Sequence, residues 1–318
     1  MTRSPKALYV VLTLLIALIT VRTLWMGYLF RSEAALEYFK PGGPTNIDGD
    51  LPPDVVVWIV TPTHKDRRRY ADLTGIAAGW YRHRHNIRWI LIEDADEIDL
   101  GFDAFISQEG FNYTYVAKQN AHKSCKGLTA RNWGLRFALE TMDTRRRNFL
   151  IFADDDNRYA SRLLPALVQE TKSISAWPVG NIGYGISTPL LDDNGSVYEF
   201  FDHYRRRWSL DMAGFGVNLN WMLTIKPADS WRLDKCAAGL QETNWVDLFN
   251  VKRSDFVCLE HCTRLLAFHT KTVKYQVWKV KPQDYRHYRK AANLPTLMER
   301  YPEYDIRLPE EVGKTEAP

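Results

Sequence analysis

Apolar segments with the length of buried strands alternate with helical segments through the first half of the chain. We expect strands at 55–60, 87–93, 113–117 and 148–153, and helices at 68–81, 127–139 and 161–171. Strands that alternate with helices at this spacing favour a mostly parallel, doubly wound sheet. The predicted fold class is therefore α/β.

Polar clusters follow three of these strands, at the sheet edge where ligands bind in folds of this kind. They are "TPTH" (61–64), "EDAD" (93–96) and the three aspartates Asp154, Asp155 and Asp156. Three adjacent carboxylates repel one another, so a cation or several hydrogen-bond donors must lie nearby. One interpretation is a solvated turn or a helix cap, in which Asp156 caps the helix that follows. The other is a site for Mg²⁺ or Mn²⁺ together with a ribose or a phosphate.

The second half has the pattern of antiparallel strands. Asn194-Gly195 predicts a two-residue hairpin turn, and 208–219 and 264–272 contain strand-like segments. Trp208 either packs in the core or stacks on a sugar. The last segment, 284–318, is expected to be a C-terminal tail.

The N-terminus predicts a membrane anchor. An apolar run from Ala7 to Val21 can extend to Phe30 if Arg22 snorkels. We therefore expect a cytoplasmic tail at 1–6, a signal-anchor helix at 7–30 and a Pro/Gly-rich stem at 31–53. A cleaved signal peptide is the alternative, although no small-x-small site directly follows the run.

Charge and cysteines narrow the class of protein further. The formal net charge of +4 over 318 residues argues against a nucleic-acid binder. Cys125, Cys236, Cys258 and Cys262 form no paired CxxC zinc pattern. The spacing of Cys258 and Cys262 allows a disulfide or two buried thiols. If the folded part is lumenal, Asn112 and Asn194 are candidate glycosylation sites.

Eight short motifs carry a resemblance to a known family. In chain order they are "TPTH", "EDAD", "ARNWGL", "FADDDN", "WPVG", "DMAGFGV", "GLQET" and "HTKT". Together they resemble glycosyltransferase family 43, the β-1,3-glucuronosyltransferases, over about residues 55–272. The resemblance implies a GT-A fold with a donor-binding half at 54–157 and an acceptor-binding, catalytic half at 158–283.

The resemblance also implies the reaction. A Mn²⁺-dependent enzyme would transfer glucuronate, with inversion, from UDP-glucuronate to a terminal galactose of a proteoglycan linker or glycoprotein glycan. It would be a single-pass type II protein of the Golgi membrane with a lumenal catalytic domain. Relatives of this kind are often homodimers, so a second copy of the chain is one partner to consider.

Individual roles follow from the matched motifs, with Glu242 as the catalytic base, Asp156 as the metal ligand, and Arg206 and Asp211 as acceptor contacts. The implied donor-binding residues are Pro62, Thr63, His64, Asp94, Lys126, Arg131, Asp154, Asp155, His269 and Lys271. Taken alone, Glu242 could instead be a first-turn residue of a helix, Arg131 a solvated charge, and His64 and His269 ordinary hydrogen-bonded histidines.

The chain departs from the family pattern at several positions. His64 stands where the family has Tyr, and Lys126 and Lys271 stand where it has Arg, which removes a bidentate fork but keeps the charge. No carboxylate follows "WPVG" in the loop where the family has an acceptor-binding Glu. Three alternatives therefore remain: another donor such as UDP-xylose, a catalytically silent sugar-binding protein, and a soluble metal-dependent phosphotransferase. The aspartate run and Glu242 argue against the silent protein, and the anchor argues against the phosphotransferase.

Overall fold

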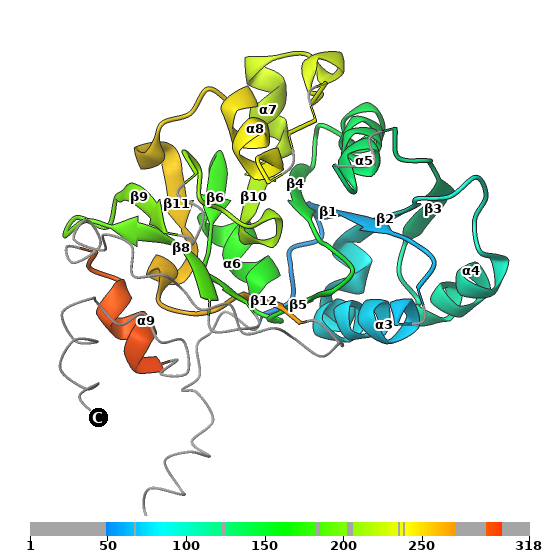
Figure 1. The fold of residues 1–318 in the computed structure, drawn as a ribbon, viewed down its shortest axis with the longest axis horizontal. Coiled ribbons are helices and arrows are strands. Elements are labelled where there is room, and N and C mark those ends of the chain that lie inside the picture. The colour runs from blue at the N-terminus through cyan, green and yellow to red at the C-terminus, as the bar shows by residue number, and fades with distance from the viewer. Residues whose placement is uncertain are drawn as a thin grey trace, which may run out of the picture. The chain divides into compact units, whose positions relative to one another are not determined.

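A mixed seven-stranded sheet forms the centre of the fold. The structure, a computed structural model, describes residues 49–66, 68–121, 125–181, 185–201, 206–234, 236–237, 239–270 and 291–300. The strand order is β11-β6-β10-β4-β1-β2-β3 (Figure 1). The bounds are β1 (Val55–Thr63), β2 (Ile87–Glu93), β3 (Tyr113–Ala117), β4 (Arg147–Phe152), β6 (Ile174–Ala176), β10 (Phe215–Asn218) and β11 (Phe256–Cys258).

Strands β4, β1, β2 and β3 are parallel, as the alternation of strands and helices predicted. Thr63 of β1 pairs in register with Glu93 of β2, and Glu93 pairs with Ala117 of β3. The carboxyl ends of these strands therefore lie along one edge of the sheet. The three polar clusters of the sequence follow strands that end at this edge.

Helices cover both faces of the sheet. Successive side chains of a strand point to opposite faces, so Val56, Trp58 and Val60 pack in one core while Val55, Val57 and Ile59 pack in the other. The first core includes α5 (Leu128–Thr141), α7 (Leu219–Ile225) and α8 (Gln241–Leu248). The second includes α3 (Arg69–Trp80), α4 (Leu100–Ile106) and α6 (Leu163–Glu170). The doubly wound α/β prediction is confirmed.

A second, five-stranded sheet has the order β5-β12-β7-β8-β9. Its strands are β5 (Asn157–Tyr159), β7 (Val179–Asn181), β8 (Gly185–Leu191), β9 (Val197–Phe201) and β12 (Ala267–His269). Most of its pairings are antiparallel, as expected for the second half, but β12 pairs parallel with β7. β5 directly follows the aspartate run and pairs with β12, with Asn157 opposite His269. This sheet therefore brings β12 next to the aspartate run. The remaining described helix, α9 (Leu294–Arg300), comes near the end of the chain.

Two details of the second half differ from the prediction. The β8–β9 hairpin has a three-residue loop instead of a two-residue turn. Asp192 N donates to Ser196 O at 3.0 Å, which leaves three residues between this pair. The last of them, Gly195, has the left-handed conformation at φ 78°. The expected strand at 208–219 is limited to β10. Met212–Gly214 form a 3₁₀ turn that is capped by Asp211, so the strand begins only after this turn, at Phe215.

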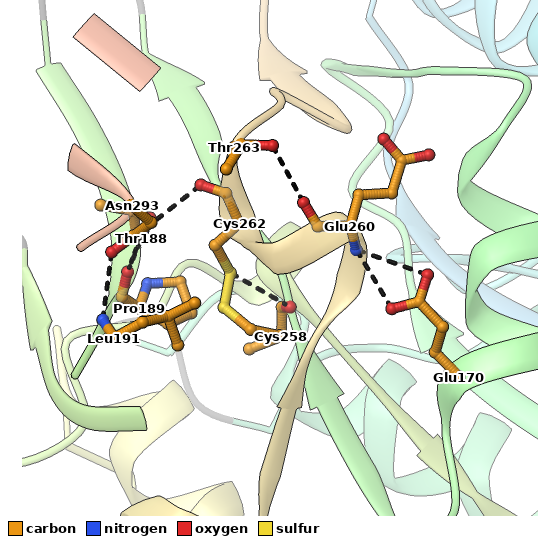
Figure 2. Close-up of a disulfide and its surroundings, with 10 residues drawn as sticks. Glu170, Thr188, Pro189, Leu191, Cys258, Glu260, Cys262, Thr263 and Asn293 are labelled. Carbon is orange, nitrogen blue, oxygen red and sulfur yellow. Dashed lines mark hydrogen bonds between the residues drawn. A yellow bond between two sulfur atoms is a disulfide. The ribbon is translucent and has the colours of Figure 1, made fainter. Parts of the chain in front are cut away.

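Both pairs of cysteines form disulfides. Cys125 bonds Cys236 across 111 residues, and Cys258 bonds Cys262 across four. The short bridge closes a turn in which Glu260, His261 and Cys262 all have positive φ (Figure 2). Glu260 N donates to the Glu170 carboxylate of α6 at 3.1 Å, which fixes this turn against the helix.

Within the described parts of the chain, no helix is both long and apolar enough to cross a bilayer. The expected tail, anchor and most of the expected stem, at 1–48, lie outside the described residues, as does most of the C-terminal tail.

A buried arginine holds the carboxyl end of β2. Arg69 Nη1 donates to Glu93 Oε1 at 2.7 Å, and Nη2 donates to Asp99 Oδ2 at 2.6 Å. The Arg69 and Glu93 side chains are 1% and 2% exposed, and Tyr115 OH also hydrogen-bonds Glu93. The first turn of α3 therefore fixes the segment 93–99 that contains "EDAD".

Arg69→Met should lower the free energy of unfolding by about 3–5 kcal/mol, because Glu93 would remain buried without its cation. The matched control is Arg145→Met, since Arg145 is 89% exposed and pairs with Asp143 at the surface. That change should cost about 0–1 kcal/mol. Urea unfolding measures both, and equal small losses would contradict the role given to Arg69.

Candidate functional site

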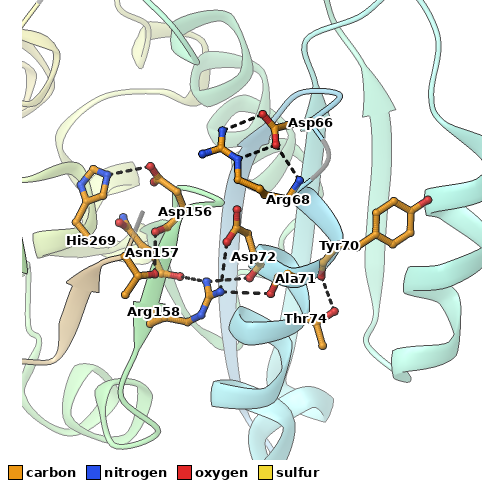
Figure 3. A network of polar contacts seen from close by, with 11 residues as sticks. Asp66, Arg68, Tyr70, Ala71, Asp72, Thr74, Asp156, Asn157, Arg158 and His269 are labelled. Atoms are coloured by element: carbon orange, nitrogen blue, oxygen red, sulfur yellow. Dashed lines mark hydrogen bonds and ion pairs between the residues drawn. The ribbon is translucent and has the colours of Figure 1, made fainter. Parts of the chain in front are cut away.

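Each aspartate of the run that follows β4 contacts a different element. Asp154 forms an ion pair with Arg131 of α5. Asp155 Oδ2 accepts a hydrogen bond from Thr63 Oγ1 of β1 at 2.8 Å. Asp156 Oδ2 contacts His269 Nε2 of β12 at 2.9 Å (Figure 3).

Asp156 does not cap the next helix, because α6 begins only at Leu163 and its N-cap position is Arg162. The backbone carbonyl of Asp156 accepts from Thr270 N at 3.0 Å and from Thr270 Oγ1 at 3.1 Å. The helix-cap interpretation of this aspartate is therefore wrong, whereas residues 155 and 156 do form a turn. Thr270 was missed in the sequence, although its position next to His269 in "HTKT" was a usable signal.

Burial and neighbouring charges shift the pKa values of Asp155 and His269. Burial raises the pKa of Asp155 to about 6, the hydrogen bond from Thr63 opposes this, and the charges of Asp154 and Asp156 add to the rise. Burial lowers the pKa of His269, but its hydrogen bond to Asp156 and the nearby carboxylates outweigh this and leave the pKa raised. Each shift thus combines the effect of burial with that of neighbouring charges.

Arg131 is the central cation of the site. It is 6% exposed, so the solvated-charge interpretation is wrong. Its Nη1 donates to Lys126 O and to Gln241 Oε1, each at 3.2 Å. Its Nε is buried and has no hydrogen-bond partner among the described residues. Gln241 was not among the predicted site residues, although it directly precedes Glu242 in "GLQET".

Glu242 lies in the first turn of α8, and its side chain is 19% exposed. Its Oε2 accepts from Arg206 Nη1 at 2.6 Å, and Arg206 Nη2 donates to Leu210 O at 2.7 Å. Burial raises the pKa of Glu242, while the positive charges of Arg206 and Arg131 oppose this and Asp211 adds to it. Glu242 is thus a half-buried carboxylate that faces one arginine.

Among the remaining predicted donor residues, Pro62, His64 and Asp94 lie at the ends of β1 and β2. Lys126 lies in the loop that precedes α5. Pro62 is close to Gly127, and the Asp94 carboxylate accepts from Asn120 N at 2.7 Å. His64, Asp94 and Lys126 are exposed. Lys271 lies outside the described residues.

The other predicted positions lie in the second half or at the surface. Burial raises the pKa of Asp211, on which His269, Asp154 and Arg206 also act electrostatically. Acceptor candidates and the aspartate run therefore belong to one cluster.

Trp208 is 3% exposed and donates to Asp247 Oδ1, so it is a core residue that cannot stack on a sugar. Asn112 and Asn194 are exposed.

The described residues contain no group of three or more His, Cys, Asp or Glu side chains arranged to hold a metal. Mg²⁺ and Mn²⁺ also bind through one or two carboxylates together with substrate phosphates. Asp156 fits such a site, because its side chain is 35% exposed at the edge of the cluster.

The family model for glycosyltransferase family 43 matches residues 79–273. This range contains all three aspartates, Arg131, Glu242 and His269. The chain belongs to glycosyltransferase family 43. The family expected from the eight motifs is thereby confirmed, and with it the glycosyltransferase class.

Among the curated family-43 relatives, galactosylgalactosylxylosylprotein 3-beta-glucuronosyltransferase sqv-8 of Caenorhabditis elegans is 26% identical over 70% of this chain and 66% of that protein. Galactosylgalactosylxylosylprotein 3-beta-glucuronosyltransferase 2 of Canis lupus familiaris is 29% identical over 70% of this chain and 70% of that protein. The Drosophila melanogaster enzyme S is 28% identical over 76% of this chain and 59% of its own length. The matches thus span about three fifths to seven tenths of these relatives.

A solved structure of S. aureus TarS 1-349 in complex with UDP-GlcNAc is also similar, with 12% identity and a TM-score of 0.46. The match covers 73% of this chain and 64% of that one. A similarity this low has no weight in assigning function.

Gly127→Ala should destabilise the protein more than Gly195→Ala. Both glycines have positive φ, which costs a side chain about 1–2 kcal/mol. A Cβ at Gly127 would also lie 2.7 Å from Arg131 Nη1 and 3.1 Å from Pro62, whereas a Cβ at Gly195 meets nothing within 4 Å. Thermal unfolding compares the two variants, and equal losses would show that the packing of Gly127 against the site does not matter.

Proposed function

We propose that this family-43 chain is a Mn²⁺-dependent, inverting β-1,3-glucuronosyltransferase that transfers glucuronate from UDP-glucuronate to a terminal galactose. The observation that carries the proposal is the convergence of the aspartate run, Arg131 and Glu242 in one cluster. The curated relatives, which are named as 3-beta-glucuronosyltransferases, support the same donor sugar and linkage. The mixed α/β fold, with its cluster at the carboxyl edge of the parallel strands, is consistent with a GT-A enzyme.

The donor would lie along the carboxyl edge of β1, β2 and β4. Pro62, Thr63, His64 and Asp94 would hold the uracil and ribose, while Asp154 and Asp155 would contact the ribose and donor sugar. Arg131 favours a uronic acid over a neutral hexose, because a guanidinium forms a charge-assisted pair with a carboxylate. Arg131 would have to redistribute its contacts, since Asp154 already pairs with it. The cationic Lys126, His269 and Lys271 complete the proposed donor site.

Mn²⁺ would be held by Asp156 together with oxygens of the donor diphosphate. When bound, it would supply positive charge to offset the negative charge that develops on UDP as the bond to the sugar breaks. Lys126 would add a second positive charge near the same oxygens. The 35% exposure of the Asp156 side chain at the edge of the cluster supports this ligand role.

Glu242 would accept the proton of the acceptor hydroxyl. Its raised pKa suits a general base better than that of an exposed carboxylate, and its half-buried position limits access of water. Attack from the face of the sugar opposite to UDP gives a single displacement with inversion, by the geometric logic of inverting glycosidases. Arg206 and Asp211 would orient the acceptor, and Arg206 would also stabilise the charged base.

The cellular setting is part of the proposal. Disulfides persist in oxidising compartments, so the two disulfides support a lumenal location. We propose the Golgi membrane, with residues 7–30 as a type II anchor. The exposure of Asn112 and Asn194 is what glycosylation would require. A homodimer is proposed from the family alone.

Thermal unfolding of the protein against a panel of UDP-sugars tests the donor and the metal. A ligand at a hundred times its dissociation constant stabilises by about 2.7 kcal/mol. The largest shift is expected for UDP-glucuronate with Mn²⁺, and it should disappear with chelator or in Asp156→Ala. A larger shift with UDP-xylose would replace the donor, and no shift with any nucleotide would favour a non-catalytic sugar-binding protein.

Glu242→Gln should retain the Mn²⁺-dependent stabilisation by UDP but lose transfer. In the wild type, transfer should fall as pH drops through the raised pKa of Glu242, because a protonated base cannot accept the acceptor proton. Arg206→Met should move this acid limb to higher pH, since Arg206 lowers the pKa of Glu242. Rate measurements across pH check this order, and transfer that survives in Glu242→Gln would identify another base.

A further inference from the structure

The segment that leads into α8, described at 231–234, 236–237 and 239–240, is fastened together with the first residue of α8 to the start of α5 at three successive points. The first is an amide pair. Asn132 Nδ2 donates to Leu233 O at 2.9 Å, and Leu233 N donates back to Asn132 Oδ1 at 2.9 Å. These two bonds align the beginning of the segment with the first turns of α5.

The second point is covalent. Cys125 is fully buried directly before Lys126, and it bonds Cys236 with the two Cα atoms 5.7 Å apart. The bridge joins the loop that precedes α5 to the middle of the segment. Because the two cysteines are 111 residues apart, this is a connection between distant parts of the chain.

The third point is the amide of Gln241, the first residue of α8. Its Oε1 accepts from Arg131 Nη1 at 3.2 Å, and its Nε2 donates to Lys126 O at 3.3 Å. Arg131 Nη1 also donates to Lys126 O at 3.2 Å, so the three residues form a closed ring of hydrogen bonds. The next residue in the chain is Glu242.

Glu242 is therefore held from two sides. Its backbone follows the fastened segment, and its carboxylate contacts Arg206. Three charged groups act on this carboxylate, namely Arg206, Asp211 and Arg131. A shift of the first turn of α8 by a fraction of an ångström would change the distances from the Glu242 carboxylate to Arg206, Asp211 and Arg131.

We infer that the Cys125–Cys236 disulfide and the Gln241 amide act as positioning elements that fix the Glu242 carboxylate against the loop at Lys126. The inference rests on the proposed function, in which Lys126 faces the donor diphosphate and Glu242 is the base. The clamp, meaning the three contacts of Asn132, Cys125 and Gln241, would thus set the distance between the leaving group and the base. Misplacement of a reacting group by about 1 Å can cost on the order of a hundredfold in rate.

Two variants test the clamp. Cys125→Ser/Cys236→Ser removes the covalent tie, and Gln241→Met removes both amide hydrogen bonds while it keeps the length of the side chain. The matched control is Cys258→Ser/Cys262→Ser, which removes the disulfide of the turn in Figure 2, where neither cysteine belongs to the proposed site. Gln241→Met decides alone if the serine variant does not fold.

Both clamp variants should lower kcat about tenfold or more, with a smaller loss of UDP affinity, because the residues proposed to hold the uracil are not part of the clamp. The control should keep the kcat of the wild type. The pKa of Glu242, assigned by ¹³C NMR with Glu242→Gln as the reference, should rise in the clamp variants as the contact with Arg206 loosens. A pure loss of stability would not move this pKa in the folded protein.

The outcomes separate the two proposals. If wild-type protein transfers no sugar from any UDP-sugar, the proposed function fails, and the pKa measurement still tests the clamp. If both clamp variants retain the Glu242 pKa and the kcat of the control, the positioning role is overturned. A moved pKa with an unchanged kcat would also overturn it as a device for catalysis.

Discussion

Three adjacent carboxylates at the end of β4 repel one another, and the fold provides each with a separate partner. Arg131 comes from α5, Thr63 from β1 and His269 from β12. None of these partners is near the aspartates in the sequence. The run can be placed at a strand end only because the central sheet, the helix that covers it and the second sheet all meet there.

Burial acts on the run as well as these partners. The pKa of Asp155 rises to about 6, mainly because the carboxyl group is buried, and the charges of Asp154 and Asp156 add to the rise. Asp156 stays 35% exposed at the edge of the cluster. The proposed divalent cation would reach it there, together with the diphosphate of the donor.

The clamp and the aspartate run meet at Arg131. One guanidinium contacts Asp154, Gln241 and the carbonyl of Lys126, so it joins the proposed metal and donor region to the first turn of α8. Arg206 has the corresponding role on the other side, where it joins Glu242 to the loop at Leu210. The proposed base is thus placed by two arginines from distant parts of the chain.

The sequence by itself determined the parallel strands and three of the helices that pack on them. Strands 87–93 and 113–117 match β2 and β3, and the other two parallel strands and the helices α3, α5 and α6 differ from the prediction by one to three residues at their ends, because apolar runs and their periodicity are local signals. Helix α4 (Leu100–Ile106), which lies between β2 and β3 in the chain, was not predicted. The motifs also named the family. Tertiary structure alone decided the pairing of Cys125 with Cys236, the partner of each aspartate, and the place of Gln241. These depend on which distant segments the two sheets bring together, and no local pattern of residues encodes such contacts. The second half was predicted less well for the same reason: its strands are three to seven residues long, and their pairing stabilises them more than their own sequence does.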